Sequence, residues 1–240
     1  MVKRLLLVMA TLAALVAVPA APAVSVHLSD ADAISVGMPT SASGSSYAFE
    51  TVLSGRPVRW DPCTPIHWRY RTSGQVVGGF TQVVKAIARI SRATGTTWVY
   101  DGAVTTAPTT AWLPKTAASR PPLLIGWSTA SHSDLLRGQP SSVLGVTRMA
   151  WFGITRNGTT TAAIRSAVVA LNQTKHLPLT GPVSWYTVVL HELSHAMGLA
   201  HAGSASELMY PVIQPRLKDL QAGDLAGLAK VGRTQGCIRL

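Results

Sequence analysis

Residues 191–201 constrain this chain more than any other stretch, because they combine two histidines four residues apart with a glycine and a third histidine. On a helix, His191 and His195 project from the same face, so both imidazoles can bind one metal ion. Gly198 tolerates positive φ, which lets the chain leave the helix and return His201 as a third ligand. Three histidines leave a fourth tetrahedral position for water, as in a catalytic zinc site.

Glu192 points about a quarter-turn away from the two helical histidines. This position suits a general base acting on a metal-bound water better than it suits a ligand. The chain has three glutamates, Glu50, Glu192 and Glu207, and an unpaired one on the apolar side of a helix would be costly. A single buried histidine is usually a core residue, but the combined pattern favours metal chemistry.

This pattern, followed by a methionine downstream, resembles the signature of the metzincin zinc peptidases. Residues 208–211 (Leu-Met-Tyr-Pro) are similar to the Met-turn of the matrixin branch. The resemblance implies a metzincin-like fold in which Met209 forms a hydrophobic floor under the imidazoles. Without the motif, Met209 would be read as core filler. The pocket for the substrate side chain after the scissile bond is implied to be lined by Tyr210, Pro211 and Val212.

The resemblance also implies a reaction. One catalytic zinc ion would activate water for attack on a peptide bond, with Glu192 as general base. An extended substrate would pair with a sheet edge strand at Gly145, Val146, Thr147 and Arg148. Asp224 is similar to a family aspartate that braces the Met-turn, although a solvated helix aspartate is the alternative.

Some positions depart from the matrixin pattern. Ala202 follows the third histidine where matrixins usually have serine, and only His132 and Asp134 precede the active helix as candidate ligands. We therefore predict no second zinc and no strong calcium site. Residues 24–50 contain no cysteine that could hold the enzyme latent. These features indicate a minimal, bacterial-type catalytic domain.

The rest of the mature chain predicts one α/β domain with a mixed, twisted sheet. Strands are predicted at residues 58–71, 96–100, 123–127, 143–154 and 160–171, and helices at 80–91, 185–198 and 217–231. The first strand–helix–strand unit implies a parallel pair. Asn157-Gly158 suits a type I′ turn, so the strands around it should form a hairpin whose outer strand is an antiparallel edge strand. Ser184 is a suitable N-cap for the active-site helix, and the last helix is C-terminal.

The N-terminal region predicts export. Lys3 and Arg4 precede a 14-residue apolar run, and small residues then suit cleavage after Ala23, although an uncleaved signal anchor is the alternative. Residues 24–50 are rich in Ser, Ala and Gly and lack an amphipathic period, so they are expected to be a linker or short pro-segment before a catalytic domain over 51–240. In an oxidising compartment Cys63 and Cys237 should form a disulfide, the alternative being two free thiols or metal ligands.

Composition narrows the classes of function. The chain is 47% hydrophobic and 13% charged, which excludes intrinsic disorder. Its formal charge of +11 is scattered without a basic run, so we expect no nucleic-acid partner but a weak association with an anionic cell envelope. The leading prediction is a secreted, monomeric zinc endopeptidase acting on protein or peptide. The alternatives are an exported binding module or pseudo-enzyme with a structural zinc, and a zinc amidase acting on cell-wall peptide.

Overall fold

The structure is a computed structural model that describes residues 24–28, 32–35 and 45–238. The predicted export signal lies outside the described residues. The strands are β1 (Val24–Leu28), β2 (Asp32–Ser35), β3 (Ala48–Phe49), β4 (Val52–Leu53), β5 (Arg56–Pro57), β6 (Ile66–Arg71), β7 (Trp98–Val104), β8 (Leu123–Ser128), β9 (Val143–Arg156), β10 (Thr159–Asn172) and β11 (Leu199–Ala200). The helices are α1 (Gly79–Thr94), α2 (Trp185–Ala196) and α3 (Ala222–Val231), with 3-10 turns η1 (Thr110–Trp112) and η2 (Arg233–Gln235).

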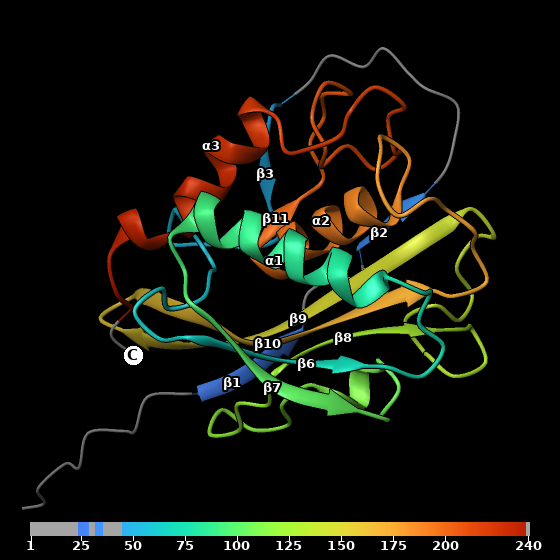
Figure 1. Ribbon diagram of the computed structural model, residues 1–240. Coiled ribbons are helices and arrows are strands. Elements are labelled where there is room, and N and C mark those ends of the chain that lie inside the picture. The colour runs from blue at the N-terminus through green and yellow to red at the C-terminus, as the bar shows by residue number, and fades with distance from the viewer. Residues whose placement is uncertain (1–23, 29–31, 36–44, 239–240) are drawn as a thin grey trace, which may run out of the picture.

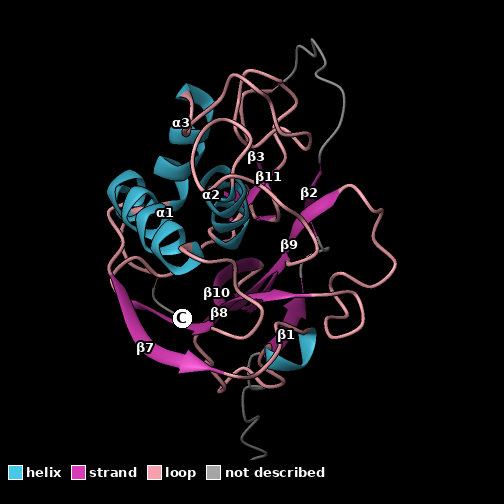
Figure 2. Cartoon of the chain, turned by 45° about the vertical axis from the view of Figure 1, so that its right-hand side comes forward, coloured by secondary structure: helices cyan, strands magenta, loops and turns pink. Residues whose placement is uncertain are grey.

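A mixed sheet carries the fold. Its strand order is β1-β9-β10-β8-β6-β7, with β2 also paired to β9. The strands β10, β8, β6 and β7 run parallel to one another, whereas β9 is antiparallel to β10, β1 and β2. The helices α1, α2 and α3 lie together on one side of this sheet (Figures 1 and 2). The predicted mixed α/β architecture is therefore confirmed.

Local signals explain most element boundaries. Asn157 and Gly158 both have positive φ, at 49° and 74°, as a type I′ turn between β9 and β10 requires. Helix α1 ends at Gly95, which has φ 69°. Helix α2 begins after Ser184, which forms a capping box with Thr187. The predicted Asn157-Gly158 turn and the predicted Ser184 cap are confirmed.

Helix α3 is shorter than the predicted helix over 217–231. It begins at Ala222, because the preceding Gln221 has extended backbone (φ −97°, ψ −177°). The Asp224 carboxylate accepts the backbone N–H of Gln221 at 2.7 Å, and thus caps the helix at this point. A side-chain cap of this kind stops a helix that apolar spacing alone would extend upstream.

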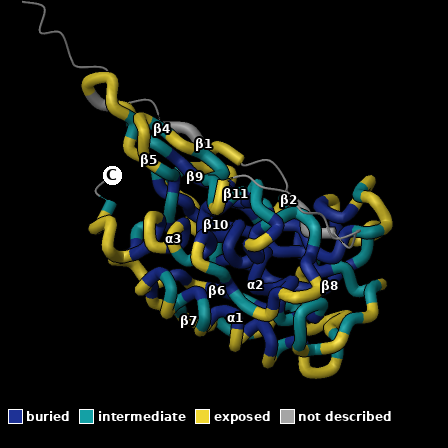
Figure 3. Tube along the Cα trace, turned by 90° about the horizontal axis from the view of Figure 1, so that it is seen from above, coloured by how far each residue is buried: buried dark blue, intermediate teal, exposed yellow. Residues whose placement is uncertain are grey.

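The core has two parts, one on each face of the sheet. The larger part lies between the sheet and the helices and includes Trp127, Trp185 and Met209, all 0% exposed. The smaller part lies under the loops that follow β7 and β8 and includes Leu113, Leu135 and Val146. Helix α2 runs through the buried centre of the molecule (Figure 3), so its polar side chains are held among apolar ones.

No strand is predicted within residues 24–50, but the described part of this range contains β1, β2 and β3, while its role as a linker or pro-segment stays a prediction. β1 pairs with β9 from Leu28 opposite Ala150, β2 pairs with β9 from Asp32 opposite Thr147, and β3 pairs with β11. A short strand that adds to an existing sheet edge needs only backbone hydrogen bonds, so its sequence need not be amphipathic. The same pairing corrects a second expectation: β9 is not a free edge strand in this structure.

A disulfide joins Cys63 to Cys237, with the two Cα atoms 5.4 Å apart. This confirms the predicted pairing and excludes both thiols as metal ligands. The bond closes a separation of 174 residues and ties the segment before β6 to the segment after η2. Among the described residues, no helix has the length and apolar character needed to cross a membrane.

Candidate metal and catalytic site

Three histidines converge in one cluster. A ring nitrogen from each of His191, His195 and His201 lies within 4.8 Å of the others. The Nε2 atoms of His191 and His195 are 3.0 Å apart. The ring of His201 has its centroid 4.7 Å from that of His195 and 5.3 Å from that of His191. The sequence prediction that these three side chains meet is therefore confirmed in position, while their role as ligands stays a prediction.

The backbone sets the direction of the first two imidazoles. The Nδ1–H of His191 donates to the carbonyl of Leu208, and that of His195 donates to the carbonyl of Leu199, both at 2.7 Å. Each ring then turns its Nε2 lone pair towards the centre of the cluster, which is the usual arrangement of histidine ligands. Burial, followed by the neighbouring imidazoles, lowers the pKa of His191 well below its ordinary value, so this ring is neutral. The donor set therefore fits Zn²⁺.

Gly198 makes the turn that brings the third histidine into the cluster. Its φ is 107°, and its N–H donates to the carbonyl of His195 at 2.8 Å. A Cβ at this position would also lie 2.7 Å from the carbonyl oxygen of Val58. Only glycine satisfies both constraints, so the predicted break after α2 is confirmed.

Glu192 is fully buried on α2 and faces β9. Its Oε2 accepts a hydrogen bond from the hydroxyl of Thr147 at 2.6 Å. The side chain lies over Gly145, where an added Cβ would come within 2.9 Å of Oε1. The sequence assigned Thr147 and Gly145 to substrate binding, and the structure shows that both also shape the surroundings of Glu192.

The segment around Met209 is held by α3. The Asp224 carboxylate accepts the backbone N–H of Leu208 at 2.8 Å and that of Met209 at 3.1 Å. The brace predicted for Asp224 is thus confirmed, and the solvated alternative is wrong, since Asp224 is 0% exposed. Burial raises the pKa of Asp224 to about 6, against the effect of the N–H groups that it accepts. Ala202 in turn donates its N–H to the carbonyl of Met209 at 2.8 Å.

Glu50 is a site residue that sequence reasoning missed. Its carboxylate lies 3.2 Å from Nδ1 of His195, and its side chain is 6% exposed. Strand β3 brings it there by pairing with β11, and the Glu50 N–H donates to the carbonyl of Gly198 at 3.0 Å. The scarcity of glutamate is the signal that could have found it. Glu192 lies on α2, Glu50 contacts His195, and Glu207 accepts the N–H groups of Gly223 and Asp224, the residue that holds the Met209 segment.

The roles of the remaining predicted residues stay predictions, and the structure gives their positions. Tyr210, Pro211 and Val212 follow the methionine and are half-buried. On β9, the backbone of residues 145–147 pairs with β10 on one side and with β2 on the other. Asp134 accepts the backbone N–H of Thr110 at 3.0 Å and therefore has a structural use in its loop.

Comparisons with known proteins agree with this geometry. A family model described as matrixin matches residues 103–231. A metalloendoproteinase from Arabidopsis thaliana, named 1-MMP, is 43% identical over 56 residues. That match covers 22% of this chain and 15% of the plant protein, so it is a local similarity.

Proposed function

The chain belongs to the matrixin family, and from this premise we propose that it is an exported zinc-dependent endopeptidase with Glu192 as its general base. Matrixins in general are zinc-dependent metallopeptidases, so the class of activity follows from the family. The observation that carries the finer proposal is the cluster of three imidazoles beside one buried glutamate.

In this proposal the histidines hold the metal. His191 and His195 bind through Nε2, because their Nδ1 atoms donate to backbone carbonyls, and His201 provides the third nitrogen. When bound, zinc would polarise the scissile carbonyl and lower the pKa of the attacking water.

Glu192 moves the proton. The Thr147 hydroxyl donates to one of its carboxylate oxygens at 2.6 Å, which helps to orient the carboxylate. From this position Glu192 takes the proton of the attacking water and passes it to the leaving amine. A structural metal site has no use for such a base, and this argues against the pseudo-enzyme alternative.

Substrate binding is proposed for the outer side of β9. An extended peptide would make backbone hydrogen bonds with Gly145, Val146, Thr147 and Arg148. The segment Tyr210–Val212 would line the pocket for the next side chain. The register of β2 supports this assignment, because Asp32, Ala33 and Ile34 form an extended segment that pairs with residues 147, 146 and 145.

The same pairing suggests how the enzyme is kept latent. We propose that β1 (Val24–Leu28) and β2 (Asp32–Ser35) belong to a pro-segment that occupies the substrate side of β9. Residues 45–50 would stay with the mature domain, because Ser45 accepts the N–H of Gly203 and Glu50 contacts His195. The proteolytic cut should therefore fall after Ser35 and before Ser45, upstream of the boundary at residue 51 that the sequence predicted.

Export is proposed from the N-terminal sequence and from the disulfide, since disulfides persist in oxidising compartments. N-terminal sequencing of the active, secreted form tests export and processing together. The expected first residue lies between 36 and 45. An active form that still begins at Val24 would contradict the pro-segment.

An activity assay separates the proposed function from its alternatives. The processed protein is incubated with casein and, in parallel, with purified cell wall, with and without a strong chelator. We expect casein cleavage that the chelator abolishes and added zinc restores. Release of cell-wall peptide without casein cleavage would favour the amidase, and no hydrolysis of either would favour the binding module.

A further inference from the structure

A cleft of about 640 Å³ lies apart from the histidine cluster. It opens beside residues 163–165 of β10, where β8 has not yet begun: β8 pairs with β10 only from Leu124 opposite Val168, and Arg59 forms an isolated parallel bridge to Ala163. Pro121 and Pro122 line the cleft from the segment before β8, and Pro65 and His67 line it from the start of β6. The volume falls within the usual range for small-ligand sites.

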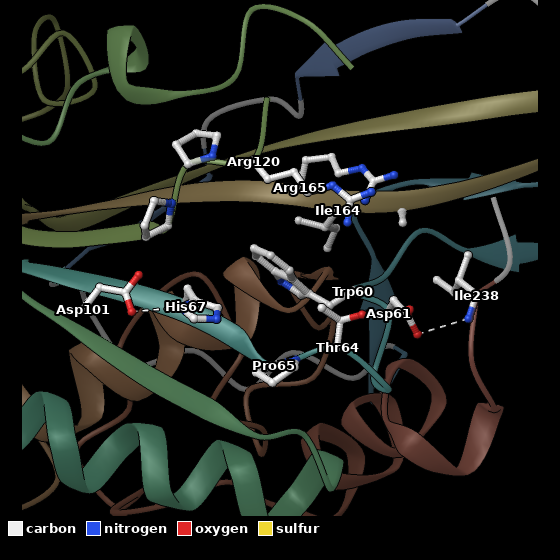
Figure 4. Close-up of a pocket in the computed structure, with 13 residues that line it drawn as sticks. Trp60, Asp61, Thr64, Pro65, His67, Asp101, Arg120, Ile164, Arg165 and Ile238 are labelled. Atoms are coloured by element: carbon white, nitrogen blue, oxygen red, sulfur yellow. Dashed lines mark hydrogen bonds and ion pairs between the residues drawn. The ribbon is translucent and has the colours of Figure 1, made fainter. Parts of the chain in front are cut away.

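The lining combines flat apolar groups with charges. Trp60 and Ile164 are buried in its floor, and three prolines form its walls. The charged groups come from different segments, as Figure 4 shows: Asp61, His67, Asp101, Arg120 and Arg165. None of these residues was assigned to the zinc site.

The acidic groups of the cleft are already engaged. Asp61 accepts the backbone N–H groups of Cys63 and Ile238, each at 3.1 Å, and the hydroxyl of Thr64. Asp101 lies 2.8 Å from Nδ1 of His67. Both carboxylates therefore have partners within the protein.

The two arginines of the cleft, Arg120 and Arg165, do not have such partners among the described residues. Arg165 is 9% exposed, and its guanidinium lies 3.8 Å from the centre of the Phe152 ring. Within residues 24–28, 32–35 and 45–238, its buried Nε has no hydrogen-bond partner, and neither arginine has a carboxylate within ion-pair distance. Burial, and next the positive charge of Arg120, lower the pKa of Arg165 to about 10. Burying one positive charge beside another costs free energy unless an anion neutralises both charges.

We propose that this cleft is a second binding site for a ligand that carries a single carboxylate on an apolar body. The guanidinium groups of Arg120 and Arg165 would bind the carboxylate, whose planar geometry matches their donors. Trp60 and the prolines would contact the apolar body. A doubly charged phosphate fits less well, because Asp61 and Asp101 lie in the same cleft. The carboxylate can belong to a free small acid or to an acidic side chain of a polypeptide.

Calorimetric titration of the zinc-loaded protein tests this site. The probes are phenylacetate, its neutral analogue phenylacetamide, and the peptide acetyl-Phe-Glu-amide, the last one titrated into the Glu192→Gln variant to prevent hydrolysis. Phenylacetate should bind at least tenfold more tightly than phenylacetamide, since charged hydrogen bonds are lost in the amide. If the peptide binds as well as phenylacetate, the ligand is a polypeptide, and if it fails to bind, the ligand is a free acid.

Variants distinguish this cleft from the metal, which can also bind carboxylates. Arg120 is exposed, so Arg120→Gln should fold normally and weaken phenylacetate binding by about tenfold. The matched control is Arg137→Gln, which removes an exposed arginine outside the cleft and should leave binding unchanged. The proposal is wrong if neither acid binds, if Arg120→Gln has no effect, or if the two variants weaken binding equally.

Discussion

Two parts of the molecule meet at the histidine cluster, and the chain encodes them in opposite ways. The motif and Met-turn, residues 191–211, bring their functional groups together through one helix, one glycine turn and one short loop. The supporting groups come from distant segments: Glu50 directly follows β3, Thr147 lies on β9 and Asp224 on α3. The first part provides the chemistry, and the second part determines how rigidly it is held. Substitutions in the two parts should therefore have different consequences.

The largest effect is expected from Glu192→Gln, which alters the motif without removing a ligand. The amide keeps nearly the same volume but cannot take a proton, so kcat should fall by about 10²–10⁴-fold. Zinc content should match that of the parent, because all three imidazoles remain. The measurement is peptide hydrolysis together with metal analysis, and His195→Ala is the comparison variant that should lose the metal. Substantial activity in Glu192→Gln with normal zinc would refute its role as base.

A substitution far from the motif should change stability and not chemistry. Cys63→Ser removes a bond that closes 174 residues, and the loop-closure model assigns such a bond on the order of 4–5 kcal/mol. Urea denaturation should show this loss in the free energy of unfolding. The kcat of the protein that remains folded should change less than twofold, with Cys237→Ser behaving alike. A large loss of kcat at full folding would mean that the disulfide shapes the site itself.

The raised pKa of the Asp224 carboxyl should make the free energy of unfolding depend on pH. Its pKa is raised to about 6 in the folded state, against an ordinary value near 3.9. The folded protein therefore binds this proton more tightly, so this contribution to stability is full below about pH 4 and is lost as the pH rises through 6. The loss is about 3 kcal/mol for a shift of about two pH units.

Comparison with Asp224→Asn isolates that contribution, because pH effects common to both proteins, including loss of metal, cancel in the difference. Between pH 4 and pH 7 the free energy of unfolding of the parent should fall by about 2 kcal/mol relative to the variant. The surface variant Asp219→Asn is the control; Asp219 pairs with Arg89. A difference that does not change over this range would contradict the raised pKa.

The smallest effect is expected at Glu50, which acts on the metal through His195. Outer partners of histidine ligands typically contribute 10–100-fold to metal affinity. Glu50→Gln should therefore raise the zinc dissociation constant by about that factor, while kcat at saturating zinc changes little. Glu207→Gln is a matched control, because this carboxylate caps α3 by accepting the backbone N–H groups of Gly223 and Asp224. Equal zinc affinity in the parent and in Glu50→Gln would show that Glu50 does not support metal binding.

The division between the two parts also explains what the sequence could predict. The spacing of His191, His195 and His201 was sufficient because helix geometry and one glycine fix their arrangement locally. The Asn157-Gly158 hairpin and the Ser184 cap were predictable for the same reason. Glu50 was not, because its contact depends on the pairing of β3 with β11, and two-residue strands have no periodic pattern to recognise.

The status of β9 as an edge was mispredicted for a related reason. Whether a strand lies at an edge depends on what pairs with it, and β1 and β2 do so through backbone groups that any sequence supplies. The start of α3 was placed too early because a carboxylate from within the helix, that of Asp224, caps it at Gln221. The cleft with Arg120 and Arg165 lies beside β10 where β8 has not yet begun, and it had no sequence signal.

Metal analysis of the purified protein tests the central claim most directly. The protein is prepared without chelator, and its zinc content is measured before and after dialysis against a strong chelator, together with peptidase activity. The account predicts one zinc per chain, the loss of metal and activity together, and the return of both when one equivalent of zinc is added. Substantially less than one zinc per chain in active protein, or activity that survives complete removal of zinc, would contradict it.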